Sequence, residues 1–202
     1  MIFIFDTLKY IFISLIFLSV FIPIFFIPTT NSNSLSSISP PISNEILDIT
    51  SNEYVWPIPG YTNISSPFGK RIKPTSGASS FHYGIDIPAP EGSKFIAVKD
   101  GQITFRNFLG AGGYTITLSF DNYKITYCHS NPNFIVNVGD FVKKGQVIGE
   151  VGPKYVNGVI NNPYHDGIGY TNGATTGPHL HFGVRKDNKY INPLNLYWLF
   201  HI

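Results

Sequence analysis

The stretch that decides the fold is Thr175-Thr176-Gly177-Pro178-His179-Leu180-His181-Phe182-Gly183, near the C-terminus. A Gly-Pro pair and a glycine flank two histidines that are separated by one leucine. Successive side chains of a β-strand point to opposite faces of the sheet. We therefore expect His179 and His181 on one face of a strand and Leu180 on the other.

A third imidazole and a carboxylate lie far earlier, in Phe81-His82-Tyr83-Gly84-Ile85-Asp86. A helix would place His82 and Asp86 on one face, but Gly84 and the prolines that follow disfavour a helix. In a straight strand the two Cα atoms would stand about 13 Å apart. Zinc ligand atoms lie only about 2.0–2.2 Å from the metal. The chain must therefore bend between the two residues, and we expect Gly84 to permit the bend.

Two histidines and one carboxylate are the ligand set of a catalytic zinc that keeps its fourth position for water. Such a metal generates a hydroxide-like nucleophile near neutral pH. Each histidine taken alone is more often a surface or core residue, but together the two patterns favour a metal site. The helical H-E-x-x-H pattern is absent from the sequence, so no helix-borne glutamate base is expected.

The rest of the domain is predicted to form short strands between turns. No window of ten or more residues in it has the 3.6-residue hydrophobic period of a helix. An Asp-Gly turn at 99–101 predicts a hairpin between its flanking runs, and Asp121-Asn122 predicts a second one. The chain is expected to turn again at Lys186-Asp187-Asn188. The sequence thus predicts an all-β fold with an antiparallel sheet or sandwich and a substrate groove. The expected strands are Ile96–Val98, Gln102–Arg106, Tyr114–Phe120, Tyr123–His129, Phe141–Val142, Gln146–Val151, His179–Arg185 and Lys189–Ile191.

The composition excludes several classes of function and of site. Charged residues make up 13% of the 202 residues, against roughly 25% in ordinary soluble domains. The formal net charge of +2 is too small to indicate a nucleic-acid partner. Cys128 is the only cysteine, so neither an intrachain disulfide nor a cysteine zinc site is possible. On a strand Cys128 would point away from His129, so we interpret it as a small core residue and not as a nucleophile.

Residues 10–27 are almost uninterrupted Ile, Leu, Phe and Val. A run of this length reaches the lower end of the about 17–25 residues that a membrane-spanning helix needs. We expect residues 1–28 to form a hydrophobic helix that acts as a transmembrane anchor or as a cleaved signal peptide. Residues 29–53, rich in Ser, Asn, Thr and Pro, then form a flexible linker, and 54–202 form the folded domain. The protein is thus expected in the cell membrane with its domain outside, or secreted.

The motifs resemble those of the lysostaphin/LytM-type zinc metallopeptidases of family M23. The resemblance covers roughly residues 57–196. It rests on His82-x-x-x-Asp86, on His129 at the end of a Tyr-rich strand, and on His179-x-His181. It also includes Ser66-Pro67-Phe68-Gly69-x-Arg71 and Val138-Gly139-Asp140-x-Val142-x-x-Gly145-Gln146, of which the second is less specific.

The resemblance implies a site and a chemistry. His82, Asp86 and His181 would bind one zinc ion per chain, while His179 and His129 would line the site without binding it. His179 would accept the proton of the attacking water and return one to the leaving amine. His129, if protonated or donating a hydrogen bond, would stabilise the oxyanion. His165-Asp166 matches neither motif and is not expected to bind metal.

The resemblance further implies an exported endopeptidase that cleaves stem or cross-bridge peptides of bacterial peptidoglycan. A non-catalytic wall-binding scaffold or amidase activator of the same fold is the main alternative, and a phosphoryl carrier with paired histidines is a third. The long segment 153–175 is expected to wall the groove, with Tyr155, Tyr164 and Tyr170 contacting peptide. The oligomeric state stays open.

Overall fold

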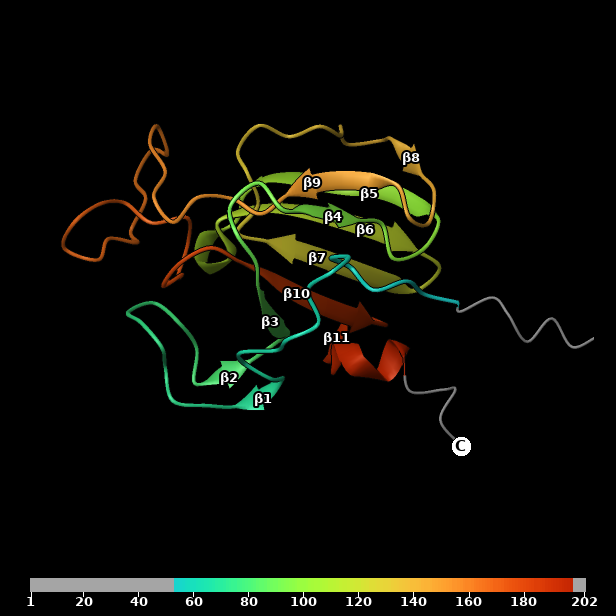
Figure 1. Ribbon diagram of the computed structural model, residues 1–202, viewed down its shortest axis with the longest axis horizontal. Helices are drawn as coiled ribbons and strands as arrows, with labels where there is room; N and C mark the ends of the chain where they lie inside the picture. Colours follow the sequence, from blue (N-terminus) through green and yellow to red (C-terminus); the bar gives the residue numbers. More distant parts are fainter. Residues whose placement is uncertain (1–52, 198–202) are drawn as a thin grey trace, which may run out of the picture. The chain divides into compact units, whose positions relative to one another are not determined.

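A seven-stranded antiparallel sheet forms the framework of the domain (Figure 1). The structure is a computed structural model that describes residues 53–197. The predicted all-β class is confirmed, because the only helices in that range are the short 3₁₀ turns η1 (Gly110–Gly112) and η2 (Pro193–Leu196). No helix within the described range has the length and apolarity to cross a membrane. The predicted N-terminal hydrophobic helix and nearly all of the predicted linker fall outside the described residues.

The strands of this sheet follow the order β11-β10-β7-β6-β5-β8. β3 pairs with the same edge of β10 as β11, opposite β7. Two smaller two-stranded sheets join β1 to β2 and β4 to β9. The strands are β1 (Gly69–Lys70), β2 (Phe81–His82), β3 (Ile85–Pro88), β4 (Lys94–Ile96), β5 (Gly101–Phe108), β6 (Tyr114–Phe120), β7 (Tyr123–Cys128), β8 (Phe141–Val142), β9 (Val147–Glu150), β10 (His179–Lys186) and β11 (Lys189–Ile191).

Two tight hairpins agree with the sequence. β6 and β7 pair across Asp121-Asn122, and β10 and β11 pair across Asp187-Asn188. Asp121, Asp187 and Asn188 have φ angles of 44°, 51° and 60°. Asp and Asn tolerate this left-handed region better than other non-glycine residues, and hairpin turns require it.

The hairpin predicted around 99–101 is wrong. β4 pairs with β9, whereas β5 pairs with β6 and β8, so the two runs belong to different sheets. The Asp100 carboxylate accepts hydrogen bonds from the Lys144 backbone N–H at 2.7 Å and from Lys143 Nζ at 2.8 Å. The aspartate therefore links its own turn to the turn between β8 and β9. The Asp-Gly pair in the sequence does not reveal this contact between distant residues.

The core lies between the main sheet and the β4-β9 pair. Phe95 of β4 stacks on Tyr127 of β7 with ring centroids 5.2 Å apart, and both side chains are fully buried. The even-numbered residues of β10, from Leu180 to Val184, face this core and are fully buried. The alternating residues, which include both histidines of the strand, therefore face the opposite side of the sheet.

One glycine fixes the end of the β6-β7 hairpin against the long segment before β10. Gly113 has φ 62° and ψ −149°, a region that is essentially confined to glycine. A Cβ atom there would overlap the carbonyl oxygen of Asn172. The Asn172 side chain accepts a hydrogen bond from Tyr114 N at 2.8 Å and donates one to Ser130 O at 3.0 Å. Asn172 thereby fastens the long segment to the ends of β6 and β7.

Replacing Gly113 with alanine is expected to lower the free energy of unfolding. Gly92 is the control, because its φ is 82° but no atom lies within 4 Å of a Cβ placed there. Gly92→Ala should cost only the left-handed strain, about 1–2 kcal/mol. Gly113→Ala should cost about 1–3 kcal/mol more, because its φ and ψ are essentially confined to glycine and the chain must also move away from Asn172. Equal losses for the two variants in chemical denaturation would contradict the close packing at Gly113.

Candidate metal centre

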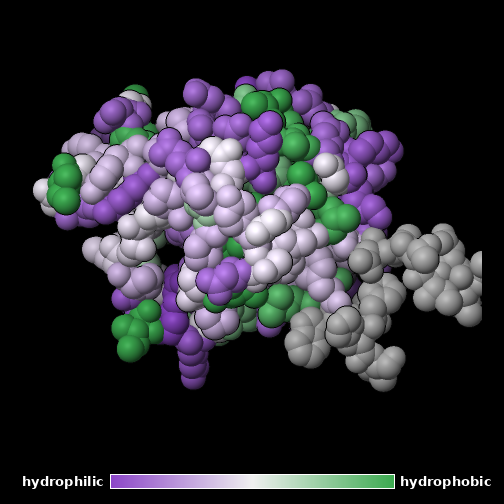
Figure 2. All heavy atoms as spheres, viewed as in Figure 1, coloured by the Kyte–Doolittle hydropathy of each residue, from purple (hydrophilic) through white to green (hydrophobic). Residues whose placement is uncertain are grey.

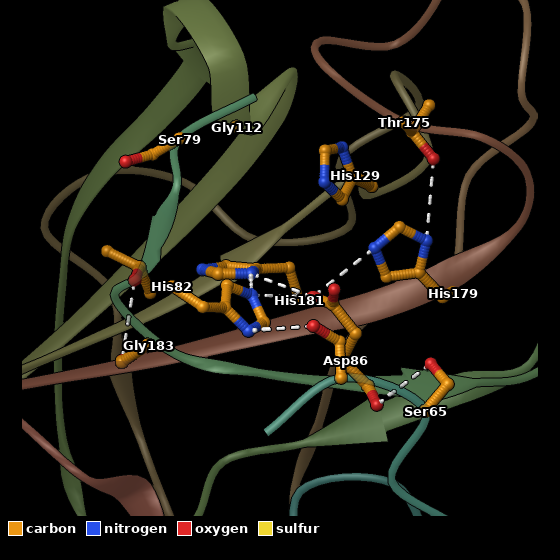
Figure 3. Close-up of polar contacts among 12 residues, drawn as sticks. Ser65, Ser79, His82, Asp86, Gly112, His129, Thr175, His179, His181 and Gly183 are labelled. Carbon is orange, nitrogen blue, oxygen red and sulfur yellow. Dashed lines mark hydrogen bonds and ion pairs between the residues drawn. The ribbon is translucent and has the colours of Figure 1, made fainter. Parts of the chain in front are cut away.

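Three potential metal ligands converge on one point above β10 (Figure 3). His82 Nε2 lies 2.9 Å from His181 Nδ1 and 3.1 Å from Asp86 Oδ1. His181 Nδ1 and Asp86 Oδ1 are 2.9 Å apart. Within residues 53–197 this is the one group of three such side chains close enough to share an ion.

Strand pairing brings the three residues together. Asp86 of β3 and His181 of β10 are cross-strand partners, so their side chains leave the sheet side by side. His82 ends β2, and the break between β2 and β3 turns the chain back toward Asp86. The predicted bend is confirmed.

Gly84 has a different role from the one expected. Its φ lies outside the left-handed region. A Cβ atom at this position would instead stand 2.7 Å from His181 Nε2 and 2.5 Å from the Phe182 carbonyl oxygen. Glycine is therefore required for the space that the His181 ring occupies and not for its backbone freedom.

Hydrogen bonds orient the buried His82 ring. Its Nδ1 lies 2.9 Å from the Pro67 carbonyl oxygen and 3.2 Å from Ser66 Oγ. A carbonyl oxygen only accepts, so Nδ1 carries the hydrogen and Nε2 presents its lone pair to the centre. A backbone carbonyl behind the ring is the usual partner of a metal-binding histidine.

Arg71 holds the second oxygen of Asp86. Arg71 Nη1 donates to Asp86 Oδ2 at 3.1 Å and to Ser66 Oγ at 2.7 Å, which leaves Oδ1 for the centre. Burial opposes the ionisation of Asp86, but its close contacts with His179, His181 and His82 hold its pKa far below the usual range. The carboxylate is therefore ionised at neutral pH. The sequence motif contained Arg71, but spacing alone gave no sign of this contact.

The donor set fits a divalent cation such as zinc. Ligand atoms about 2.0–2.1 Å from a tetrahedral zinc stand about 3.3 Å from one another. The three observed separations of 2.9–3.1 Å are close to that value. Two imidazole nitrogens and a carboxylate oxygen so close together, with one ring fixed as a lone-pair donor, suit a shared cation better than mutual hydrogen bonds.

The other two predicted histidines lie beside this group. His179 Nε2 is 3.4 Å from Asp86 Oδ1, and its Nδ1 is 2.9 Å from the Gly177 carbonyl oxygen. His129 Nδ1 is 2.7 Å from the Asn172 carbonyl oxygen, and its ring centroid is 4.6 Å from that of His179. All five predicted site residues thus come together. The spacing of residues gave no sign that Asn172 would hold His129.

Cys128 is buried, as predicted, but the expected strand alternation breaks next to it. His129 has φ 56°, so both Cys128 and His129 border the pocket above the sheet. Burial raises the pKa of the Cys128 thiol to about 11. The thiol is therefore protonated at neutral pH, which argues against a cysteine nucleophile.

The five residues line a cavity of about 760 Å³. The β1-β2 loop forms one wall through Pro74 and Ser79, and residues 174–178 form another. On the face of the domain seen in Figure 2, hydrophilic residues predominate and hydrophobic residues form smaller patches among them.

The expectation that three tyrosines of the long segment line the groove is wrong for this cavity. Tyr164 packs against Gly77, and Tyr155 donates a hydrogen bond to Asp166 at 3.0 Å. Tyr170 packs against His165 with ring centroids 4.9 Å apart. The segment therefore contributes only its C-terminal end to the wall.

Comparison with known proteins agrees with this geometry. Over 137 residues, or 67% of its length, the chain is 34% identical to the DD-carboxypeptidase/endopeptidase Mpg of Neisseria meningitidis serogroup B, covering 27% of that protein. It is 31% identical to the peptidoglycan DD-endopeptidase ShyB of Vibrio cholerae over 66% of the chain and 28% of that protein. The chain thus spans about a quarter of the length of these relatives.

A solved zinc-containing peptidase from Vibrio cholerae superposes with a TM-score of 0.53 at 28% identity, over 68% of this chain and 37% of that one. Residues 80–193, which contain all five clustered side chains, match the model of peptidase family M23. This match extends over more than half of the chain. The chain therefore belongs to peptidase family M23.

Proposed function

We propose that this protein is a zinc-dependent endopeptidase that hydrolyses stem or cross-bridge peptides of bacterial peptidoglycan. The observation that carries the proposal is the convergence of His82, Asp86 and His181 at the floor of a cavity that His129 and His179 also line. The similarity to ShyB, a peptidoglycan DD-endopeptidase, supports the substrate class. The similarity to a zinc-containing peptidase of Vibrio cholerae supports zinc as the metal.

His82 Nε2, Asp86 Oδ1 and His181 Nδ1 would hold one zinc ion per chain. When bound, zinc lowers the pKa of a water molecule and polarises the scissile carbonyl. Arg71 binds Oδ2 of Asp86, which leaves Oδ1 turned toward the ligand group. Because His82 is fixed through the Pro67 carbonyl, its orientation is set before any metal arrives.

His179 is placed to act as the proton acceptor. Its Nδ1–H donates to the Gly177 carbonyl oxygen, so a neutral ring turns the lone pair of Nε2 toward Asp86 and the ligand group. Nε2 accepts the proton of the attacking water and later donates one to the leaving amine.

His129 has a similar arrangement. Its Nδ1–H donates to the Asn172 carbonyl oxygen, so Nε2 of the neutral ring can accept a hydrogen bond but not donate one. Burial lowers the pKa of His129, and the nearby His179 and His181 lower it further. We therefore place His129 as a second proton acceptor that donates to the oxyanion only after it has been protonated.

The apolar run of residues 10–27 supports export, and we propose that residues 1–28 anchor the chain in the membrane or are cleaved as a signal peptide. Residues 29–53 would then act as a spacer that lets the domain from residue 54 onward reach the wall. The proposed location is the outer face of the cell membrane, or the medium if the segment is removed.

The test is to incubate the zinc-loaded protein with purified peptidoglycan and to weigh the soluble products by mass spectrometry. Release of peptides by hydrolysis of an amide bond is expected. Zinc binding with no cleavage of any peptidoglycan would instead indicate a scaffold or amidase activator. Phosphorylation of His179 or His181 with no bound zinc would indicate a phosphoryl carrier.

Asp86→Asn is expected to abolish zinc binding and to lower activity by about 10³-fold or more, because it removes a charged ligand. Asp166→Asn is the matched control, since Asp166 pairs with Lys154 at 2.8 Å outside the ligand group. The control should keep about one zinc per chain in metal analysis and near-normal turnover. Loss of zinc in the control, or retention in Asp86→Asn, would refute the proposed site.

His179→Ala is expected to lower kcat by about 10²–10⁴-fold while zinc occupancy stays normal, because it removes a proton acceptor and not a ligand. His165→Ala is the control, since His165 lies on the exposed part of the long segment. It should change neither quantity. Normal turnover of His179→Ala with normal zinc content would eliminate His179 as the base.

The metal-free protein is expected to lose stability as the pH falls from 7.5 to 5.5. His129 has an ordinary pKa of 6.5, which burial lowers in the folded state. Below 6.5 the unfolded chain binds a proton that the folded chain does not, so the free energy of unfolding falls by up to about 1.4 kcal/mol per pH unit. Burial lowers the pKa of His181 as well, so His129→Gln should remove only part of this slope.

Urea denaturation at several pH values in the presence of a chelator measures the slope. The exposed His165 provides the control, and His165→Gln should follow the wild type. Identical slopes for His129→Gln and the wild type would show that His129 is not held neutral by burial.

A further inference from the structure

A cationic side chain lies in the same cavity as the metal centre, at its other end along β10. His179, His181, Gly183 and Arg185 alternate on the face of this strand that points away from the core. Arg185 and Tyr190 both line the cavity that the five site residues share. Because the intervening position is a glycine, no β10 side chain stands between His181 and Arg185.

An aromatic side chain holds the guanidinium group in place. The Cζ of Arg185 lies 4.6 Å from the centroid of the Tyr190 ring, and Tyr83 in turn packs on Tyr190 with centroids 4.7 Å apart. Stacking on a ring restrains the plane of a guanidinium and leaves its N–H edges free. The group is therefore preorganised to bind a planar anion.

Arg185 has no anionic partner among the described residues. Its Nε is buried and makes no hydrogen bond. Arg71, in contrast, pairs with Asp86 at 3.1 Å, and this aspartate is the one acidic residue that lines the cavity. Because Nε itself is buried, an anion in the cavity would meet the terminal nitrogens of the guanidinium group.

We propose that Arg185, stacked on Tyr190, is a subsite that binds a carboxylate of the peptide substrate. The inference rests on the proposed function and deepens it, because it makes a free carboxyl group a determinant of which peptides are cleaved. A carboxylate is the anion that a wall peptide carries, and its two oxygens match the fork of a guanidinium.

The length of the strand sets the position of this carboxylate in the substrate. His181 and Arg185 are four positions apart on the strand, which is about 13 Å. An extended peptide advances about 3.3 Å per residue, so the carboxylate lies about three to four residues from the scissile bond. The subsite thus selects substrates at a distance from the reacting atoms and takes no part in proton transfer.

The test uses the full-length chain loaded with zinc and two cross-linked peptide dimers. One dimer carries free carboxylates, and the other carries carboxamides at the same positions. Wild-type kcat/KM is expected to be about 10- to 100-fold higher for the carboxylate dimer, the range of a charge-assisted bidentate pair. In Arg185→Gln this ratio should fall to near 1, and Arg185→Lys should give an intermediate value.

Arg106→Gln is the matched control. Arg106 also lies over an aromatic ring, that of Phe134 at 5.6 Å, but it does not line the cavity. The control should keep the wild-type ratio. Dimers amidated at a single position then tell whether the carboxylate is a C-terminal one or a side-chain one. Equal ratios for the wild type and Arg185→Gln, or no preference in the wild type, would overturn the proposal.

A binding measurement separates the subsite from the proposed function. If the wild type cleaves neither dimer, the endopeptidase proposal fails. Equilibrium binding of the same two dimers to the wild type and to Arg185→Gln then decides the subsite. Tighter binding of the carboxylate dimer that is lost in Arg185→Gln supports the subsite, and equal binding refutes it. Urea denaturation of each variant confirms that it is folded.

Discussion

The antiparallel pairing of β3 with β10 is the constraint on which the site depends. It sets Asp86 directly opposite His181, although the two residues lie 95 positions apart in the chain. Cross-strand neighbours are held at nearly fixed separation by the backbone ladder, so the pairing itself positions two of the three potential metal ligands. The third, His82, needs only the short break after β2 to reach them.

Backbone carbonyls orient three of the four clustered histidines. His82, His129 and His179 each use Nδ1 against a carbonyl oxygen, of Pro67, Asn172 and Gly177 respectively. A carbonyl oxygen does not titrate in the physiological range, so these orientations do not depend on pH. His181 is the exception, since its Nδ1 faces the centre and its other nitrogen lies against Gly84.

Local patterns in the sequence predicted much of this molecule. The β6-β7 and β10-β11 hairpins follow from alternating side chains and Asp or Asn turns, and the shared face of His179 and His181 follows from strand geometry. The predictions that were wrong concerned features that depend on contacts between distant segments. The turn at Asp100 joins two sheets because its partners lie at Lys143 and Lys144. The left-handed φ of His129 likewise goes with the hydrogen bond from its ring to the Asn172 carbonyl oxygen. Its neighbours in sequence do not reveal this contact.

The attachment of Asn172 divides the long segment before β10 into two parts with different freedom. Its side chain forms hydrogen bonds at the ends of β6 and β7, while its carbonyl oxygen accepts a hydrogen bond from the His129 ring. The portion from 154 to 171 makes no comparable contact with the five clustered residues. That portion can therefore change in length and composition while His129 keeps its place. The fold thus keeps the position of His129 independent of the length and composition of residues 154–171.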